Sequence, residues 1–267
     1  RRAAWLNVHI SDDRQSSVAP RARPRVTNAK KVYWPRHDST PEITKGELVD
    51  YYASISEFML PHLVGRPTHI KRFPSGIDGK QFFQRHLPEG APEWVESIDV
   101  TTEKKTERLL HCNSRETLRY LANLGSIEFH PWMSRVGSLE LPNVCVIDID
   151  AKQSDFATAV KAAREIAKLL NGISIRSYLK TSGRTGLHVS VPIEPRYSYD
   201  HSRMCAEVIA RIVAMEYPDQ FSVDRSPNQR GRRVYLDFLQ NGFGKTIVAP
   251  YSVRPTKFAS VSTPLHW

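Results

Sequence analysis

The stretch that most constrains the fold of this chain is VCVIDID, from Val144 to Asp150. Its apolar residues are typical of a strand buried in a core, yet it ends in two carboxylates, Asp148 and Asp150. Residues two apart in a strand share a face, so these side chains lie together and each raises the cost of ionising the other. A divalent cation would relieve that repulsion. The alternative is structural: Asp150 ends the strand and Asp148 pairs with an arginine.

The segments that follow this strand predict a mixed sheet covered by helices. A helix is predicted over 154–172, with Ser154 as its N-cap, and a second over 200–216. Further strands are predicted over 173–180, 187–193 and 232–239. Strands that alternate with helices in this way indicate an α+β (mixed α/β) domain.

The first half of the chain predicts a second group of elements. Thr44 and Glu47 form a capping box ahead of a helix, and Ser114 caps another helix that Gly125 closes. Strands are expected within THIKRFP and SIEFHPW. Residues 1–25 are polar and basic and contain prolines, and we interpret them as an arm or linker preceding one catalytic domain over 26–267.

Charge and cysteine content narrow the class of protein. The net charge of +10 favours an anionic partner, most simply nucleic acid. Cys112, Cys145 and Cys205 form no C-x-x-C pair, and we expect reduced thiols in the core of a cytoplasmic protein. No apolar run reaches the ~18 residues of a membrane span, so no membrane association is expected. The chain starts RRAAW, which is compatible with a piece of a longer protein.

A third carboxylate, Asp237, interrupts the apolar strand VYLDFL. Acidic groups from two adjacent strands can hold two metal ions that clamp the attacking and leaving oxygens in phosphoryl transfer. A buried ion pair with one of the arginines just upstream, at positions 230, 232 and 233, explains Asp237 equally well.

Two loops carry groups suited to phosphate. KTSGRTGLH combines Lys180, Ser182 and Arg184 with glycine amides, which is typical of a phosphate-binding nest. NGFGK supplies Lys245 in the same manner, although no Walker sequence is present. His188 begins the return strand, where a histidine is more often a satisfied core residue.

Two adjacent phenylalanines, Phe82 and Phe83, occupy the basic segment KQFFQRH. In an extended segment they point to opposite sides, so both cannot enter one core face. One interpretation is an exposed platform for stacking bases. The other is one core phenylalanine and one packed beneath a loop.

Taken together, these stretches resemble the polymerase domain of bacterial DNA ligase D and its stand-alone relatives in the archaeo-eukaryotic primase superfamily. The matching motifs run in order from TNAKKVYWP through KQFFQRHLP, IEFHPW, VIDID and KTSGRTGLHVSVP to RGRRVYLDFLQNGFGKTIVAPYSVR and VSTPL. The resemblance implies a primase-type catalytic core with an RRM-like mixed sheet and a packed N-terminal lobe.

The implied activity is that of a template-directed DNA or RNA nucleotidyltransferase that fills gaps and extends ends at DNA breaks in non-homologous end joining. Implied cofactors are two Mn²⁺ (or Mg²⁺) ions. Implied partners are DNA bearing a 5′-phosphate, NTPs or dNTPs, Ku and a DNA ligase, in the bacterial nucleoid. A stand-alone primase or an excision-repair gap-filling polymerase is the alternative, and a catalytically decayed DNA-end-binding module is a third reading that the intact aspartates oppose.

The family roles fall on specific residues of this chain. The catalytic and metal-binding carboxylates fall on Asp148, Asp150 and Asp237. The residues for the incoming nucleotide fall on His130, Ser182, His188, Arg230, Lys245 and Arg254. The DNA contacts fall on Lys31 and Lys45 for the 5′-phosphate, on Lys71, and on Phe82 and Phe83 against the template.

Two departures from the family pattern stand out. Thr185 occupies a position where relatives often carry a lysine, with Arg184 one residue earlier as a substitute. The chain is also shorter than some relatives between HPW and VIDID, so the loop that controls primer or synapsis is expected to differ.

Overall fold

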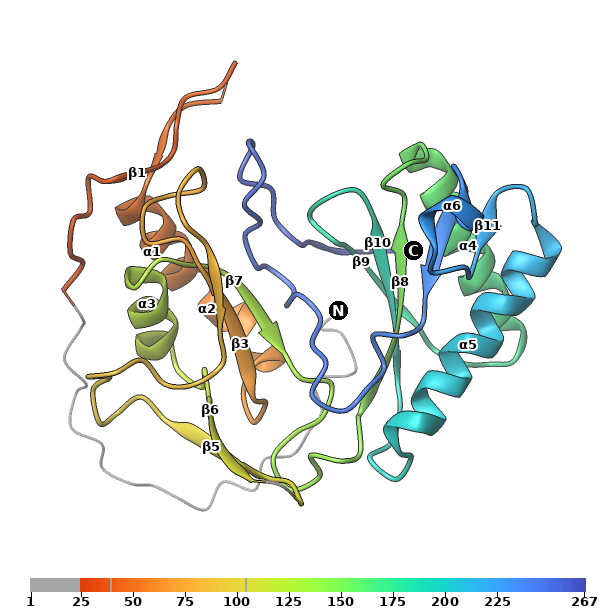
Figure 1. The fold of residues 1–267 in the computed structure, drawn as a ribbon, viewed down its shortest axis with the longest axis horizontal. Coiled ribbons are helices and arrows are strands. Elements are labelled where there is room, and N and C mark those ends of the chain that lie inside the picture. Colours follow the sequence, from red (N-terminus) through yellow and green to blue (C-terminus); the bar gives the residue numbers. More distant parts are fainter. Residues whose placement is uncertain (1–24, 39, 104) are drawn as a thin grey trace.

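The computed structural model describes residues 25–38, 40–103 and 105–267, which form two lobes that face each other (Figure 1). Helices and sheets are both present, as the mixed α/β class requires. The predicted arm lies outside the described residues, apart from its last position. Within the described part of the chain, no helix is long and apolar enough to cross a membrane.

The C-terminal lobe is built on a six-stranded sheet in the order β11-β12-β8-β10-β9-β13. Its strands are β8 (Val144–Asp150), β9 (Tyr178–Thr181), β10 (Leu187–Pro192), β11 (Phe221–Ser222), β12 (Val234–Asp237) and β13 (Pro264–Leu265). Strand β8 is antiparallel to both of its neighbours, β10 and β12. Helices α4 (Phe156–Gly172) and α5 (Tyr199–Glu216) lie on the outer side of this sheet, and the short α6 (Pro227–Arg230) precedes β12 (Figure 1).

One face of β8 forms the core of this lobe. Ile147 and Ile149 are buried with Leu236 of β12 and with alanines of α4, whose small side chains let the helix approach the sheet. Because strand residues alternate, Asp148 and Asp150 are on the opposite face, which the helices leave open.

Two predictions about this lobe are wrong in detail. The N-cap of α4 is Asp155, whose Oδ1 accepts the backbone N–H of Thr158 at 2.7 Å, and Ser154 lies one residue outside the helix. Cys205 is exposed on α5, whereas Cys145 and Cys112 are buried as expected. Cys205 lies at the border of the buried face of α5, beside Cys145, so the helix context alone did not decide its burial.

The N-terminal lobe has a three-stranded sheet, β4-β3-β7, with helices on one side and two hairpins around it. The strands are β3 (Thr68–Arg72), β4 (Phe82–Gln84) and β7 (Ser126–Pro131), and the hairpins are β1 (Val32–Trp34) with β2 (Ile43–Thr44) and β5 (Ser97–Thr101) with β6 (Thr106–Leu110). The helices are α1 (Lys45–Ser54), α2 (Ser56–Met59), η2 (Leu60–His62) and α3 (Arg115–Asn123). The predicted capping box on α1 and the Ser114 cap on α3 are confirmed.

Gly125 after α3 shows why a glycine is needed there. Its φ is +88°, and a Cβ would lie 2.9 Å from the hydroxyl of Tyr33 and 3.1 Å from the carbonyl oxygen of Phe73. Because of the positive φ and the close packing, any other residue at this position would strain the backbone and clash with its neighbours. The turn therefore brings α3 directly back onto the sheet as β7.

The chain crosses between the lobes more than once. It passes from β7 to β8, and after β12 it returns to the N-terminal lobe and joins the two lobes by hydrogen bonds. Residues 246–262, here called the return segment, leave the C-terminal lobe after β12 and hydrogen-bond to the N-terminal lobe. The Ala249 N–H donates to the Phe129 carbonyl, the Phe129 N–H donates to Ser252 Oγ, and the Val253 N–H donates to the Tyr52 hydroxyl. The chain then returns to pair β13 with β9. Arg254 lies on this shared segment.

Candidate active site

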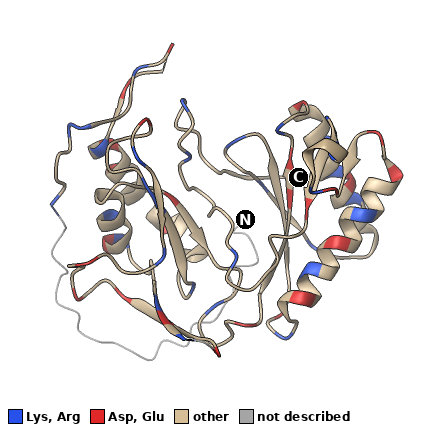
Figure 2. Ribbon diagram, in the orientation of Figure 1, with Lys and Arg blue, Asp and Glu red and all other residues tan. Residues whose placement is uncertain are grey.

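Four polar residues form a continuous row across the open face of the C-terminal sheet. Asp237 on β12 pairs directly with Asp148 on β8, Asp148 pairs with His188 on β10, and His188 pairs with Lys180 on β9. Directly opposed residues in an antiparallel pair have Cβ atoms about 4.5–5.5 Å apart. Two carboxylates, an imidazole and an amine are therefore neighbours on one rigid surface. Figure 2 shows the acidic strands with basic loops on both sides.

Asp148 is the centre of this row. Its Oδ1 lies 3.3 Å from Nε2 of His188. Burial alone would raise the pKa of Asp148, but His188, Lys180 and Arg254 together lower it. Burial, reinforced by Lys180, lowers the pKa of His188 to about 4 even though Asp148 opposes this. At neutral pH the pair is therefore an ionised carboxylate and a neutral imidazole whose Nε2–H faces Asp148.

Asp237 is held by a different set of groups. Its Oδ1 accepts the backbone N–H of Leu239 at 2.8 Å, and its Oδ2 accepts Nε2–H of Gln240 at 2.9 Å. Burial raises its pKa, the Leu239 and Gln240 hydrogen bonds counteract this, and the nearby charge of Asp148 adds to the rise. Opposite shifts in two facing carboxylates indicate a site short of positive charge.

Asp150 lies two residues beyond Asp148, on the same face of β8 and opposite Tyr235 of β12. Its Oδ1 accepts the backbone N–H of Lys152 at 3.0 Å. All three predicted aspartates are thus on neighbouring strands and on one face, as the resemblance requires.

The donor set fits a hard divalent cation that also binds substrate. Asp148 and Asp237 face each other, and carboxylate oxygens are the ligands that Mg²⁺ and Mn²⁺ prefer. Among the described residues no group of three or more His, Cys, Asp or Glu side chains is close enough to form a complete protein cage. Mg²⁺ usually binds one or two carboxylates and completes its shell with water and substrate phosphates. Two facing carboxylates in an open cleft match that mode.

The sequence analysis missed a residue that organises the opposite wall. Glu128 of β7 is 1% exposed, and three cationic or titratable side chains converge on it. Its Oε1 lies 2.8 Å from Nε of Arg254 and 3.3 Å from Nη2 of Arg184, and its Oε2 lies 3.5 Å from Nε2 of His130. Burial would raise the pKa of Glu128, but His130, Arg254 and Arg184 lower it overall. The sequence contained one indication of this residue, because Glu128 is a charged side chain within the apolar stretch SIEFHPW.

The β9–β10 turn, residues 182–186, lies between Arg254 and the end of β8. Gly183 has φ +70°, and a Cβ there would lie 2.6 Å from Cγ of Arg254. A Cβ at Gly186 would overlap the carbonyl oxygen of Ile149. Ser182 Oγ accepts the N–H groups of Arg184 and Gly186, each at 3.1 Å. Two amides of the predicted phosphate nest are thus already bonded within the turn, and the glycines serve close packing against the site.

The predicted nucleotide-binding residues form two groups on opposite sides of the aspartates. His130, Ser182 and Arg254 lie toward β7, β10 and the return segment, with His188 in contact with Asp148. Arg230 and Lys245 lie on the β12 side. The Arg230 guanidinium is 4.7 Å from the centre of the Tyr235 ring, and Lys245 Nζ donates to the Leu239 carbonyl at 2.5 Å.

The predicted DNA-binding lysines occupy two places in the N-terminal lobe. Lys31 and Lys45 are adjacent at the amino end of α1, where the Lys45 N–H donates to the Lys31 carbonyl. Lys45 Nζ is buried and donates to the Thr27 carbonyl at 2.7 Å, and burial, together with Lys31, lowers its pKa. Lys71 is instead directly opposite Glu128 in the register of β3 and β7.

Phe82 and Phe83 are both exposed on the edge strand β4, at 38% and 62%. Each has its own cation: Arg72 lies 5.3 Å from the Phe82 ring centre, and Lys71 lies 5.4 Å from that of Phe83. The Phe83 ring also meets His130 edge to face, with centres 5.6 Å apart. This agrees with the exposed-platform interpretation and excludes the reading that placed one of them in the core.

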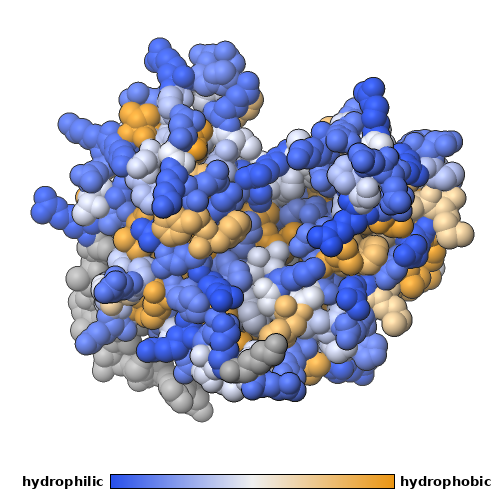
Figure 3. All heavy atoms as spheres, in the orientation of Figure 1, coloured by the Kyte–Doolittle hydropathy of each residue, from blue (hydrophilic) through white to orange (hydrophobic). Residues whose placement is uncertain are grey.

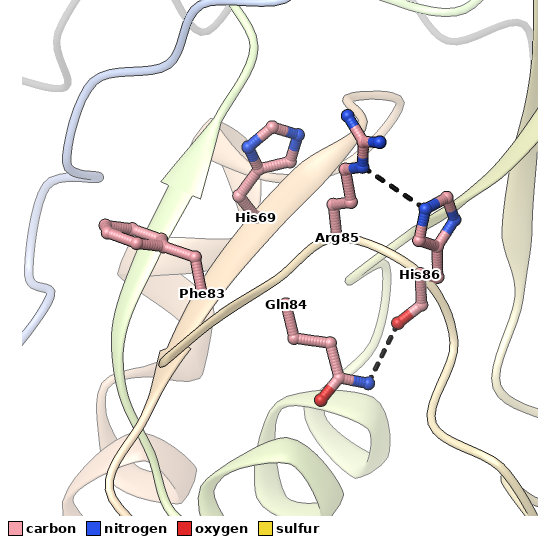
Figure 4. A pocket seen from close by; sticks show the side chains of 5 residues that line it. All are labelled: His69, Phe83, Gln84, Arg85 and His86. Atoms are coloured by element: carbon pink, nitrogen blue, oxygen red, sulfur yellow. Dashed lines mark hydrogen bonds between the residues drawn. The ribbon is translucent and has the colours of Figure 1, made fainter. Parts of the chain in front are cut away.

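A cavity of about 430 Å³ adjoins Phe83 and is lined by His69, Gln84, Arg85 and His86. In Figure 4 the Phe83 ring, His69 and Arg85 stand on one side of β4, while Gln84 points away from them. Arg85 Nε donates to Nε2 of His86 at 3.2 Å. The space-filling view shows a hollow between the two lobes (Figure 3).

Comparison with known proteins gives consistent matches. The family model described as LigD, primase-polymerase domain, matches residues 44–267. The bifunctional non-homologous end joining protein LigD of Bacillus subtilis is 34% identical over 226 residues, covering 84% of this chain and 36% of that protein. The multifunctional LigD of Mycolicibacterium smegmatis is 32% identical over 248 residues, 92% of this chain and 32% of that protein. The chain spans about a third of the length of these relatives.

A solved structure matches the fold closely. It is the polymerase domain from Mycobacterium tuberculosis ligase D in complex with DNA, with a TM-score of 0.83 and 30% sequence identity. The match covers 92% of this chain and 87% of that domain. The lobes and sheets described above are therefore those of a known polymerase-domain fold.

Proposed function

The chain belongs to the LigD primase-polymerase domain family, and we propose that it is a template-directed nucleotidyltransferase that fills gaps and extends ends at DNA breaks. The family resemblance drawn from the sequence motifs is thereby confirmed. One observation carries the activity: the row Asp237, Asp148, His188 and Lys180 across the open face of the sheet. It places a carboxylate pair next to an imidazole and an amine on a rigid surface.

In the proposed reaction the primer 3′-OH attacks the α-phosphorus of a bound nucleoside triphosphate, the bond to the β-phosphate oxygen breaks, and pyrophosphate leaves. Two Mn²⁺ or Mg²⁺ ions held by Asp148, Asp150 and Asp237 would lower the pKa of the 3′-OH and neutralise the triphosphate oxygens. The protein's own residues bind and orient the reactants, which supplies much of the rate in such a reaction.

His188 acts as a positioning residue in this proposal. As a neutral imidazole, 3.3 Å from Asp148, it fixes that carboxylate without neutralising it. A protonated histidine there would compete with a metal ion for the same oxygen. Burial beside Lys180 keeps the proton off at working pH.

The triphosphate is proposed to lie along β10, β9 and the return segment. Arg254 is fixed there by Glu128, and Lys180 Nζ donates to Ser262 Oγ at 2.7 Å. Both side chains are held in place before substrate arrives, so little reorganisation is needed when charge develops. Burial and Arg254 lower the pKa of Lys180 well below its usual value, so a bound anion would favour its charged form. Ser182 in the adjacent turn and His130 beside Glu128 complete this side of the site.

For DNA, the Lys31 and Lys45 pair supports recognition of a downstream 5′-phosphate. Two lysines at the amino end of α1 add to the positive end of the helix dipole. Lys45 is buried beside another cation, which is unfavourable unless an anion binds nearby. Phe83 with Lys71 supports a stacking contact to the template strand.

The same chemistry serves an end-joining pathway that includes Ku and a ligase, and we propose this context from the names of the relatives. The test offers Mn²⁺ with NTPs or dNTPs and three DNAs: a gap with a 5′-phosphate, the same gap without it, and an unprimed template. Extension that prefers the phosphorylated gap is expected. No extension on any DNA refutes the polymerase assignment, and equal use of both gaps refutes the Lys31 and Lys45 assignment. Synthesis on the unprimed template favours a primase instead.

A further inference from the structure

A second cavity, of about 440 Å³, lies where α6 meets the amino end of α4. Figure 1 shows these two helices side by side at the end of the C-terminal sheet. The residues that line the cavity include Ser154, Thr158, Asp219, Arg230, Arg232 and Arg233. Three arginines and one carboxylate thus line a single opening, and the excess of positive charge favours an anionic ligand.

The arginines of this cavity are held in different ways. Arg233 donates from Nε to the Arg230 carbonyl at 2.9 Å and lies 3.6 Å from Asp224, so it supports the loop. Arg230 is stacked on Tyr235. Arg232 is exposed and borders the cavity. Gly231 between them has φ +61°, a conformation that glycine adopts at low cost and that turns the chain so that its neighbours border one space.

The cavity adjoins β12 through Arg230, which is stacked on Tyr235 of that strand. Tyr235, under Arg230, pairs with Asp150 across the sheet, and its hydroxyl donates to Asp237 Oδ1 at 3.4 Å. Strand β10 and then β9, which carries Lys180, are on the other side of β8. The aspartates therefore lie between the triphosphate side and the arginine cavity.

The order of these sites across the sheet indicates which DNA strand the cavity binds. In phosphoryl transfer the attacking and leaving oxygens are roughly in line through the phosphorus. If pyrophosphate leaves toward β10 and β9, the 3′-OH approaches from the β12 side. We infer that the arginine cavity binds a backbone phosphate of the primer strand, close to its 3′ end, with Arg232 as the principal contact. The inference rests on the proposed function, because it needs the triphosphate on the β10 side.

A primer-extension assay on the phosphorylated gap tests it, with Arg232→Ala compared with wild type. We expect the KM for the primer-template to rise about tenfold, as for loss of one charge-assisted phosphate contact, with the KM for the nucleotide unchanged. Arg211→Ala is the matched control, because Arg211 is an exposed arginine of α5 paired with Glu207 at 2.7 Å. It removes the same charge from the outer face and should leave both KM values unchanged.

Neutral methylphosphonate linkages locate the contact. One such linkage is placed at each of the last three positions of the primer in turn. At one position it should raise the KM of wild type for the primer-template. It should not raise that of Arg232→Ala, because the arginine that would contact this phosphate is already absent. The same replacements in the template strand should raise the KM for the primer-template equally in wild type and in Arg232→Ala. If Arg232→Ala raises the nucleotide KM instead, or if only template replacements lose their effect in the variant, the inference is wrong. If wild type extends no primer, the proposed function itself fails.

Discussion

Replacing Glu128 by glutamine should destabilise the fold by an amount that depends on pH. The carboxylate is buried and contacts Arg254 and Arg184, with Arg254 itself nearly buried. Removing one partner of a buried pair costs about 3–5 kcal/mol, because the other charge is left uncompensated. Arg184 is partly exposed and solvent can reach it, so the lower end, about 3 kcal/mol, is the better expectation.

The pH dependence follows from the sign of the shift. The pKa of Glu128 is lowered in the folded protein, so its contribution is present above the unfolded value of about 4.3. It is lost as pH falls below that value through the folded pKa. The difference in unfolding free energy between wild type and Glu128→Gln should therefore be constant from pH 8 to about 5 and shrink below about 4.

Urea unfolding at several pH values measures this difference. With an m-value of about 3 kcal/mol/M, the midpoint of Glu128→Gln should fall by about 1 M at pH 7. Glu140→Gln, which changes an exposed glutamate, is the control and should leave the midpoint unchanged. A double-mutant cycle with Arg254→Met should show strong coupling. A midpoint change below about 0.3 M, or additive effects in the cycle, would refute the argument that Glu128 holds the cation in place.

Three other substitutions test the remaining parts of the site. Asp148→Asn should reduce primer extension more than about 100-fold while DNA binding is retained, measured by single-turnover extension and a mobility shift. His188→Gln should become more stable relative to wild type as pH falls from about 6.5 toward 4. In this range His188 of wild type is protonated in the unfolded chain but stays neutral in the folded protein, which lowers the unfolding free energy of wild type. An unfolding free energy that changes equally with pH in both proteins would contradict this. Lys45→Met should abolish most of the preference for 5′-phosphorylated gaps without changing kcat on gaps that lack the phosphate.

The sequence indicated the carboxylates but not their pairing. A charge inside an apolar strand has few structural reasons, so Asp148 and Asp237 were identifiable from their context. That these two face each other depends on the register between β8 and β12, which no local pattern specifies. Glu128 had the same signal as Asp237 but was not recognised, because its partners Arg184 and Arg254 come from distant segments.

The errors have similar physical causes. Ser154 and Asp155 are both good N-caps, and only the backbone geometry selects Asp155. The two groups of nucleotide-binding candidates could not be separated from sequence, since α6 and the β9–β10 turn lie on opposite sides of β8 only in the folded sheet.

The return segment has a consequence for how the protein is made. While residues 246–262 are still inside the ribosome, the N–H and the carbonyl of Phe129 in the emerging N-terminal lobe lack their native partners, Ser252 and Ala249. Buried polar groups without partners are costly, so this lobe cannot reach its final packing until residues 246–262 have emerged. A nascent chain stalled before residue 246 should therefore be digested by protease in the N-terminal lobe, and a chain from which residues 246–262 have emerged should be resistant there.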